Sequence, residues 1–190
     1  MRIGLLGGSF NPAHDGHRHI AELARKRLKL DQVWLIVSPG NPLKPQTGMA
    51  TLEDRMRGAR AIANGRHVVA TRIEAALKTR FTVDTLHFLL RRFPHARFVW
   101  IMGADILEQL PRWRRWLDIA GRLSFAVLPR PTYNHRALAG QAARRLRAAR
   151  HPAREATLLP GLAPGWAFLV ARQSALSATA IRAASKGPVR

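Results

Sequence analysis

The segment at positions 7–17, GGSFNPAHDGH, has residue types and spacings that suit anion binding. Its two leading glycines let the backbone approach a ligand closely. A helix that starts after them would direct free N–H groups and the positive end of its dipole at a phosphate. His14 and His17 are three residues apart, so in the first turn of that helix they share one face and can bind the same anion. We therefore predict a phosphate site in this segment.

Other interpretations of the segment stay open. Each histidine alone could cap the helix or lie on the surface, and together with His19 the pair could hold a metal, although no carboxylate pattern accompanies them. The chain has neither a G-x-G-x-x-G fingerprint here nor a G-x-x-x-x-G-K-[ST] P-loop elsewhere. Because it contains no cysteine, it also lacks thiolate metal ligands, disulfides and a cysteine nucleophile. We expect no resident metal ion.

A second anion site is expected near the C-terminus, in the sequence LSATAIR at positions 176–182. Ser177 is a suitable N-cap, so a helix should begin there. The N–H groups of its first turn, the Thr179 hydroxyl and the Arg182 guanidinium would then surround a phosphate. Taken by itself, this segment is only a capped helix.

Short apolar runs alternate with segments of helix-forming composition, which is typical of a parallel sheet with crossover helices. The expected strands are at 3–6, 33–37, 68–71, 98–102, 124–128 and 167–170. The expected helices are at 17–29, 51–63, 82–93, 105–118 and 135–150, with a short sixth after Ser177. We predict an α/β fold, a Rossmann-like open parallel sheet with helices on both faces. The length of 190 residues, against a prior of roughly 150 per domain, favours a single domain over residues 1–190.

The chain is strongly basic, with 32 Lys and Arg against 11 Asp and Glu and a formal net charge of +21. This excess favours anionic partners in general. Six arginines and no acidic residue fall at 136–154, in a pattern typical of an Ala-rich amphipathic helix with a solvated basic face. An RNA-binding domain is the alternative that this charge raises, but the chain shows no RNA-binding module or aromatic platform. We expect no nucleic-acid partner.

Membrane and secretory features are also not expected. The N-terminus runs from a short apolar stretch straight into turn residues, unlike a secretory signal. The longest charge-free stretch, 156–171, contains two prolines and two glycines and is shorter than the about 20 residues that a membrane helix needs. We therefore predict a cytoplasmic protein without a membrane partner. The sequence leaves its oligomeric state open.

The two anion-binding segments resemble the paired signatures of a known superfamily. The first resembles the H-x-G-H signature of the α/β phosphodiesterase-like nucleotidyltransferases, and it is most similar to the GG[ST]F[DN]PxHxGH start of the bacterial nicotinate-nucleotide adenylyltransferases. The second resembles the superfamily's [IL]S[SA]TxIR signature, in the same order and at the same distance. The resemblance extends from Met1 to about Arg182.

Motifs between the signatures extend this resemblance on the nucleotide side. The stretch NPLK at 41–44 is similar to an N-P-x-K stretch of the family, which implies that Lys44 reaches ATP phosphates. Arg55 and Met56 follow, as in a helix of the family. The sequence MGAD at 102–105 is similar to a G-x-D pattern, which implies that Gly103 lets adenosine approach and that Asp105 binds ribose hydroxyls.

Further motifs bear on the second substrate. Phe81 and Thr82 stand where the family has a Tyr-Thr pair, which implies that the Thr82 backbone meets a nicotinate carboxylate while Phe81 lacks the hydroxyl. In LPRW, at 110–113, the resemblance implies that Trp113 stacks on the pyridine ring and that the N–H of Arg114 binds the carboxylate. Arg130 matches the arginine of an R-P turn near the nucleotides.

The resemblance implies adenylyl transfer from ATP to nicotinic acid mononucleotide, giving nicotinic acid adenine dinucleotide and pyrophosphate in NAD biosynthesis. Because the attacking phosphate oxygen has a second pKa of about 6, no general base is needed. Mg²⁺ would arrive bound to ATP oxygens. The roles implied are catalytic for His14, His17 and Arg182; ATP-binding for Gly7, Gly8, Ser9, Phe10, Lys44, Gly103, Asp105, Ser177, Thr179 and Arg182; and substrate-binding for Thr82, Trp113, Arg114 and Arg130.

A sister family, the phosphopantetheine adenylyltransferases, is the alternative within the superfamily. Its first motif usually reads T-x-x-H or T-N-G-H. The GGSFNPAHDGH start and the GADILEQLPRW stretch of this chain argue against it.

Overall fold

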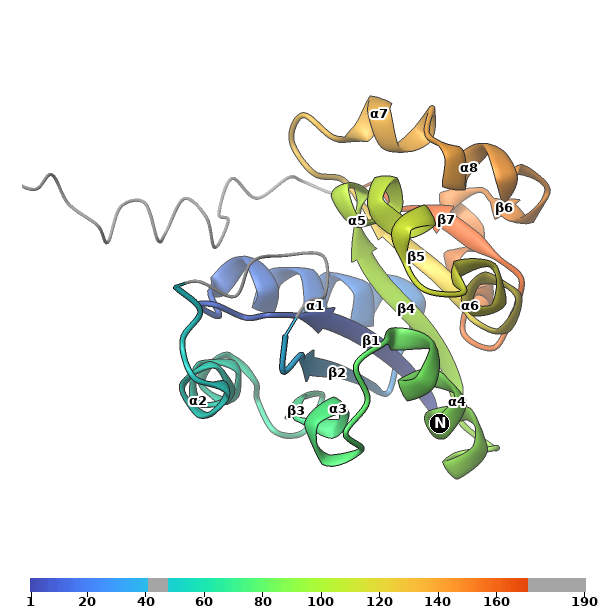
Figure 1. Cartoon of the computed structure of the whole chain (residues 1–190). Helices are drawn as coiled ribbons and strands as arrows, with labels where there is room; N and C mark the ends of the chain where they lie inside the picture. Colours follow the sequence, from blue (N-terminus) through green and yellow to red (C-terminus); the bar gives the residue numbers. More distant parts are fainter. Residues whose placement is uncertain (41–47, 171–190) are drawn as a thin grey trace, which may run out of the picture.

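The computed structural model describes residues 1–40 and 48–170 of the chain. Seven parallel strands form one sheet in the order β3-β2-β1-β4-β5-β7-β6 (Figure 1). The predicted α/β class and open parallel sheet are confirmed, and each expected strand is present within two residues of its expected ends. Only the two-residue β6 was not expected. The strands are β1 Arg2–Gly8, β2 Gln32–Val37, β3 Val68–Thr71, β4 Arg97–Gly103, β5 Ser124–Leu128, β6 Arg150–His151 and β7 Trp166–Phe168.

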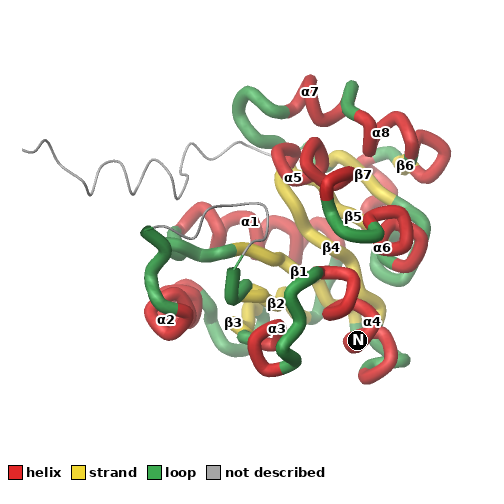
Figure 2. Tube along the Cα trace, in the orientation of Figure 1, coloured by secondary structure: helices red, strands yellow, loops and turns green. Residues whose placement is uncertain are grey.

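Helices cover both faces of the sheet (Figure 2). Buried apolar side chains of α1 and α2 belong to one hydrophobic cluster, and those of α4 to α8 belong to the other. Within the described ranges, no helix is long and apolar enough to cross a membrane. The helices are α1 Asp15–Leu28, α2 Leu52–Ile62, α3 Ile73–Ala76, α4 Thr82–Arg92, α5 Ala104–Gln109, α6 Trp116–Arg122, α7 Asn134–Leu138 and α8 Gln141–Arg145, with 3-10 helices η1 Leu110–Arg112, η2 Arg147–Ala149 and η3 Ala153–Leu158.

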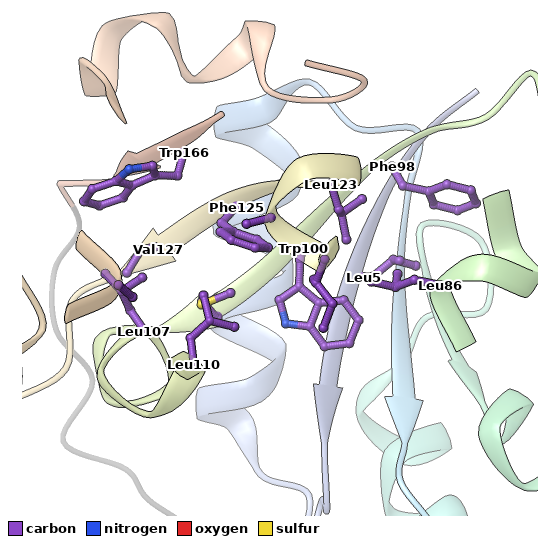
Figure 3. Close-up of a cluster of buried hydrophobic side chains, with 14 of the residues drawn as sticks. Leu5, Leu86, Phe98, Trp100, Leu107, Leu110, Leu123, Phe125, Val127 and Trp166 are labelled. Carbon is purple, nitrogen blue, oxygen red and sulfur yellow. The ribbon is translucent and has the colours of Figure 1, made fainter. Parts of the chain in front are cut away.

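The central strands are buried on both faces, which explains their nearly continuous apolar sequences. In β4, Phe98, Trp100 and Met102 belong to one cluster, whereas Val99 and Ile101 belong to the other. Figure 3 shows the first cluster, in which Trp100 lies among side chains from neighbouring strands and from the helices that cover them. Polar side chains are thereby confined to the ends of these strands.

The helix expected at 105–118 is interrupted, so this prediction was wrong. α5 ends at Gln109, the 3-10 helix η1 follows, and α6 begins only at Trp116. Pro111 lies in η1 and has no N–H for an α-helical hydrogen bond. Arg115, just before α6, has a φ of +53°, which an α-helix does not contain. Trp113 and Arg114 consequently lie in a turn between two short helices.

The helix expected at 135–150 is also divided, into α7 and α8. Gly140 lies between them, where a Cβ would come 3.0 Å from the carbonyl oxygen of Arg136. The side chains of Arg144, Arg145 and Arg147 are exposed, as the pattern of a solvated basic face predicts. The helix expected after Ser177 lies outside the described residues.

The strand order creates a switch point beside β1. From β1 the chain proceeds outward to β2 and β3, and it then returns to the other side of β1 to form β4. Open α/β sheets bind ligands at the carboxyl ends of the strands that flank such a point. The GGSFNPAHDGH segment follows β1, and Gly103 ends β4. Two of the predicted nucleotide-binding motifs therefore flank the switch point.

Gly4→Ala should destabilise the fold, because β1 has no room for a side chain at this position. A Cβ on Gly4 would lie 2.6 Å from Ile101 Cδ1 and 2.7 Å from Leu30 Cδ1. Overpacking of a core costs about 1 to 3 kcal/mol, which urea denaturation would measure as a lower free energy of unfolding.

Gly121→Ala is the matched control for this measurement. A Cβ there would meet nothing within 4 Å, and alanine is preferred to glycine in a helix by about 1 kcal/mol. We expect unchanged or higher stability. Equal stability of the two variants would contradict the described packing of β1.

Candidate active site

The end of β1 lies against two large buried rings, those of Trp100 and Phe10. A Cβ on Gly7 would lie 2.7 Å from the indole ring of Trp100, and a Cβ on Gly8 would lie 3.3 Å from the ring of Phe10. Phe10 is 1% exposed, has a φ of +48° and places its ring centroid 4.8 Å from that of His17. The packing of rings at the strand end thus excludes a side chain at Gly7 and leaves little room for one at Gly8. This reason for the glycines adds to the close approach of a ligand that the sequence suggested.

His14 and His17 form a capping box at the start of α1. Nδ1 of His14 accepts the backbone N–H of Gly16 at 3.1 Å, and Nδ1 of His17 accepts the backbone N–H of His14 at 3.2 Å. A ring nitrogen that accepts a hydrogen bond carries no proton, so each neutral ring carries its proton on Nε2. The two ring centroids are 3.9 Å apart. Capping and anion binding are therefore compatible, because Nδ1 caps the helix while Nε2–H stays available to a ligand.

Burial keeps both histidines neutral near pH 7. Burial, followed by the neighbouring His14 and the charge of Arg130, lowers the pKa of His17 to about 3. Burial is also the main cause of the lowered pKa of His14, with Arg130 adding to the effect and Asp15 opposing it. The rings can therefore donate hydrogen bonds as neutral imidazoles. An anion bound beside them would raise the pKa of both.

Arg130 and Asp105 meet beyond the carboxyl ends of β5 and β4. Nε of Arg130 lies 3.6 Å from Oδ1 of Asp105, and neither buried atom has a hydrogen-bond partner in the part of the chain that the structure describes. A Cβ on Gly103 would collide with Oδ1 of Asp105 and lie 3.0 Å from Cγ of Arg130. The glycine of the G-x-D pattern thus makes room for this pair. Asn134 holds the arginine in place, since its Oδ1 accepts the Arg130 backbone N–H at 2.7 Å.

An aromatic and basic cluster lies on the other side of β4. Trp113 packs edge to face on Trp100, with ring centroids 6.0 Å apart and planes at 87°. The guanidinium carbon of Arg114 lies 4.8 Å from the centroid of the Phe81 ring, over its face. The structure therefore brings the turn at 113–114 to the start of α4, although the two are far apart in sequence.

Backbone donors are available at this junction. Phe81 precedes α4 without capping it through a side chain, so the N–H of Thr82 is one of the free donors of the first turn. The N–H of Arg114 makes no backbone hydrogen bond within residues 1–40 and 48–170. Both donors suit an acceptor such as a carboxylate, and the Arg114 guanidinium adds positive charge beside them.

Two polar residues that the sequence did not single out stabilise the loops of the site. Asn11 Oδ1 accepts the N–H of Ala50 at 3.2 Å, which fastens the loop after β1 to the segment before α2. Glu74 is 8% exposed, and burial raises its pKa while hydrogen bonds with Ser38 and Thr85 oppose the shift. The sequence could have identified Glu74, because it is an acidic residue in an apolar segment directly after an expected strand.

The second predicted anion site lies outside the described residues, as do its residues Ser177, Thr179 and Arg182 and the loop residue Lys44. Within the ranges that are described, no group of three or more His, Asp or Glu side chains could hold a metal ion. The site described is therefore built from His14, His17, Arg130 and the ends of β1 and β4.

Comparison with known proteins shows to which family this site belongs. The cytidylyltransferase-like family model matches residues 5–184. A probable nicotinate-nucleotide adenylyltransferase of Gluconacetobacter diazotrophicus is 57% identical over 185 residues, covering 97% of this chain and 86% of the relative. Another, of Gluconobacter oxydans, is 56% identical over 183 residues, covering 96% and 94%. The chain belongs to the cytidylyltransferase-like family and, within it, to the nicotinate-nucleotide adenylyltransferases.

Solved structures of this adenylyltransferase family share the fold. The nicotinic acid mononucleotide adenylyltransferase of Plasmodium falciparum complexed with NaAD superposes with a TM-score of 0.72 at 15% identity, covering 95% of this chain and 82% of that chain. Its complex with APC gives a TM-score of 0.71 at 14% identity, covering 96% and 83%. At these identities the likeness demonstrates the fold alone.

The stability of the unliganded adenylyltransferase should fall as the pH falls from 7 to 5, partly because of His17. Its folded pKa of about 3 is below the unfolded value, so its neutral form stabilises the fold above pH 6.5 and that stability is lost on acidification. We expect a loss of about 2 kcal/mol from this residue between pH 7 and pH 5, measured by urea denaturation without phosphate.

His17→Gln should lack this part of the pH dependence while keeping an acceptor for the capping box. His19→Gln is the control, because the exposed His19 lies on the same helix. A wild-type pH dependence in His17→Gln would contradict the lowered pKa.

Proposed function

We propose that the chain transfers the adenylyl group of ATP to nicotinic acid mononucleotide, giving nicotinic acid adenine dinucleotide and pyrophosphate in NAD biosynthesis. Relatives named for this activity are 56% and 57% identical to it over nearly its whole length. The observation that carries the proposal is the pair His14 and His17, held by their own helix cap as neutral Nε2–H donors beside the charge of Arg130.

The reaction needs alignment and charge neutralisation more than proton transfer. A phosphate oxygen of the mononucleotide, already ionised near neutral pH, forms a bond to the α-phosphorus of ATP. The bond from that phosphorus to the bridging oxygen breaks in line, and pyrophosphate leaves with the electron pair. Negative charge builds on the transferring and leaving groups, so oriented N–H donors and cations lower the barrier.

We assign His14 and His17 to the transferring and leaving phosphates. Their Nε2–H donors need no prior protonation, and their pKa values rise as the anion binds. The backbone of residues 7–9 and the N–H of Phe10 are assigned to the α-phosphate region. Gly103 and Asp105 are assigned to adenosine, with the carboxylate accepting hydrogen bonds from ribose hydroxyls.

Residues outside the described ranges complete the nucleotide side of the proposal. Lys44, Ser177, Thr179 and Arg182 are assigned to the β- and γ-phosphates, on the basis of their motifs. Mg²⁺ enters with ATP as part of that substrate. A cytoplasmic location and a single domain over residues 1–190 remain part of the same proposal.

The junction of α4 with the turn at 113–114 is assigned to the nicotinate group. The N–H groups of Thr82 and Arg114 would bind its carboxylate, and Trp113 would stack on the pyridine ring. A carboxamide in that place would set its NH₂ against a donor, whereas a carboxylate only accepts hydrogen bonds. The arrangement therefore favours the acid over the amide.

Comparing nicotinic acid mononucleotide with its amide tests the proposed function. A mispaired polar group in a closed pocket costs about 1 to 3 kcal/mol, so we expect kcat/KM to favour the acid by roughly ten- to a hundred-fold or more. Pyrophosphate release from ATP is the readout, with pantetheine phosphate and RNA as alternative partners.

Trp113→Ala should lower kcat/KM for both mononucleotides through lost stacking, while the preference for the acid persists because its donors are backbone groups. Equal kcat/KM values for acid and amide on the wild type would indicate a dual-specificity enzyme. Turnover only with pantetheine phosphate would favour the sister family.

His17→Ala should lower turnover by roughly 10² to 10³, the cost of removing one oriented transition-state donor. Binding of ATP should change less, because the charge that His17 neutralises develops during the reaction. The matched control is His19→Ala, on the exposed side of the same helix, which should keep wild-type turnover. Wild-type turnover in His17→Ala would remove His17 from the mechanism, and loss of activity in His19→Ala would favour the metal interpretation of the three histidines.

A further inference from the structure

On the basis of the proposed function, we infer that Arg55 is a positioning residue for the phosphate-binding loops. Arg55 lies in the first turns of α2 and is 3% exposed, which is unusual for an arginine. It does not line the switch point itself. Its guanidinium instead reaches the backbone of the loops that follow β1 and β2.

Arg55 donates hydrogen bonds to four backbone carbonyls from three segments. Nη1 donates to Ser9 at 2.9 Å, in the loop after β1, and to Ser38 at 2.6 Å, directly after β2. Nη2 donates to Pro39 at 3.2 Å, and Nε donates to Ala50 at 3.0 Å. One side chain therefore holds the loop after β1, the residues directly after β2 and the segment before α2 in a single arrangement.

This hydrogen bonding leaves the guanidinium little capacity to bind a ligand directly. A guanidinium has five N–H donors, and four of them are engaged by these carbonyls. Lysine could not replace it, because an ammonium group is a compact point charge that cannot span carbonyls on three segments. Arg55 thus acts on the phosphates through the loops that it holds.

The contact with Ser9 determines how the adjoining peptide group is turned. In a planar trans peptide the C=O and the N–H point in opposite directions. Because the Ser9 carbonyl points toward Arg55, the N–H of Phe10 points away from it and stays available to the nucleotide. Phe10 also packs its ring on His17, so a shift of this peptide would disturb the histidine as well.

The positive charge of Arg55 has no carboxylate partner within residues 1–40 and 48–170. Among the described residues it forms no ion pair, and burial lowers its pKa. Positions 41–47 and 171–190 contain no Asp or Glu either. A buried cation balanced only by carbonyl dipoles leaves positive potential beneath the loops, which a polyphosphate bound above them would offset.

Arg55→Met and Arg55→Lys test this inference. In both variants we expect weaker binding of a non-hydrolysable ATP analogue, measured by calorimetry, and a lower kcat/KM for ATP. The loss should be about 100-fold for methionine and about 10-fold for lysine, because small misplacements of binding groups have effects of this size. Affinity for nicotinic acid mononucleotide should change much less, since its nicotinate group is assigned to the junction of α4 with the turn at 113–114, which Arg55 does not contact.

Arg57→Lys is the matched control, because Arg57 lies on the same helix with its side chain 75% exposed and pairs with Asp54. It should keep wild-type values of ATP-analogue affinity and of kcat/KM for ATP.

Circular dichroism establishes that each variant is folded at the assay temperature. A folded Arg55→Lys variant with wild-type ATP affinity overturns the inference, as does an equal loss for both substrates or failure of both Arg55 variants to fold. If the wild-type protein binds the ATP analogue but does not turn over nicotinic acid mononucleotide, the proposed function is instead overturned.

Discussion

Everything in this structure depends on the burial of the central strand β1. It is hydrogen-bonded to β2 on one side and β4 on the other, and its side chains pack into both hydrophobic clusters. A strand enclosed in this way can expose polar groups only where it ends. The chain reverses its winding direction beside β1, so the carboxyl ends of β1 and β4 are left without a helix between them. The loop with the GGSFNPAHDGH motif therefore lies where β1 ends.

The electrostatics of the site combine fixed charge with neutral donors. Arg130 and Arg55 place positive charge near the strand ends. Burial, with a smaller contribution from Arg130, makes it costly to protonate His14 and His17. His14 and His17 therefore remain neutral until an anion arrives. In the proposed function, a polyphosphate bound beside them would reverse the balance, because its negative charge favours the imidazolium forms. The site is thus able to gain positive charge as the substrate binds, without storing all of it in the free protein.

Loop geometry is set by side chains that bind backbone groups. Arg55 holds carbonyls of two loops, Asn11 holds the N–H of Ala50, and the two histidines cap the helix that follows. Glycines at 7, 8 and 103 remove side chains where rings or charged groups already fill the space. These two roles explain why the segments around the site combine small residues with polar ones. The glycines make room for neighbouring side chains, and the polar residues fix the backbone of the loops.

The sequence alone determined the fold class, the strands and the motif that lies at the switch point, because these depend on local apolar periodicity and on residue types at fixed spacing. The breaks in the helices expected at 105–118 and 135–150 were missed because the pattern of apolar residues continues through them, although the sequence contains the helix breakers Pro111 and Gly140. The positive φ of Arg115 is visible only in the structure. The sequence predicted His14 and His17 as ligands or caps, and the structure shows that both are caps. The capping role required Nδ1 of each ring to be seen beside a backbone N–H, and the contacts of Arg55 required carbonyls from three segments to meet around one buried side chain. Only the tertiary structure decides such matters, because burial and long-range contacts set which polar atoms are left to bind a ligand.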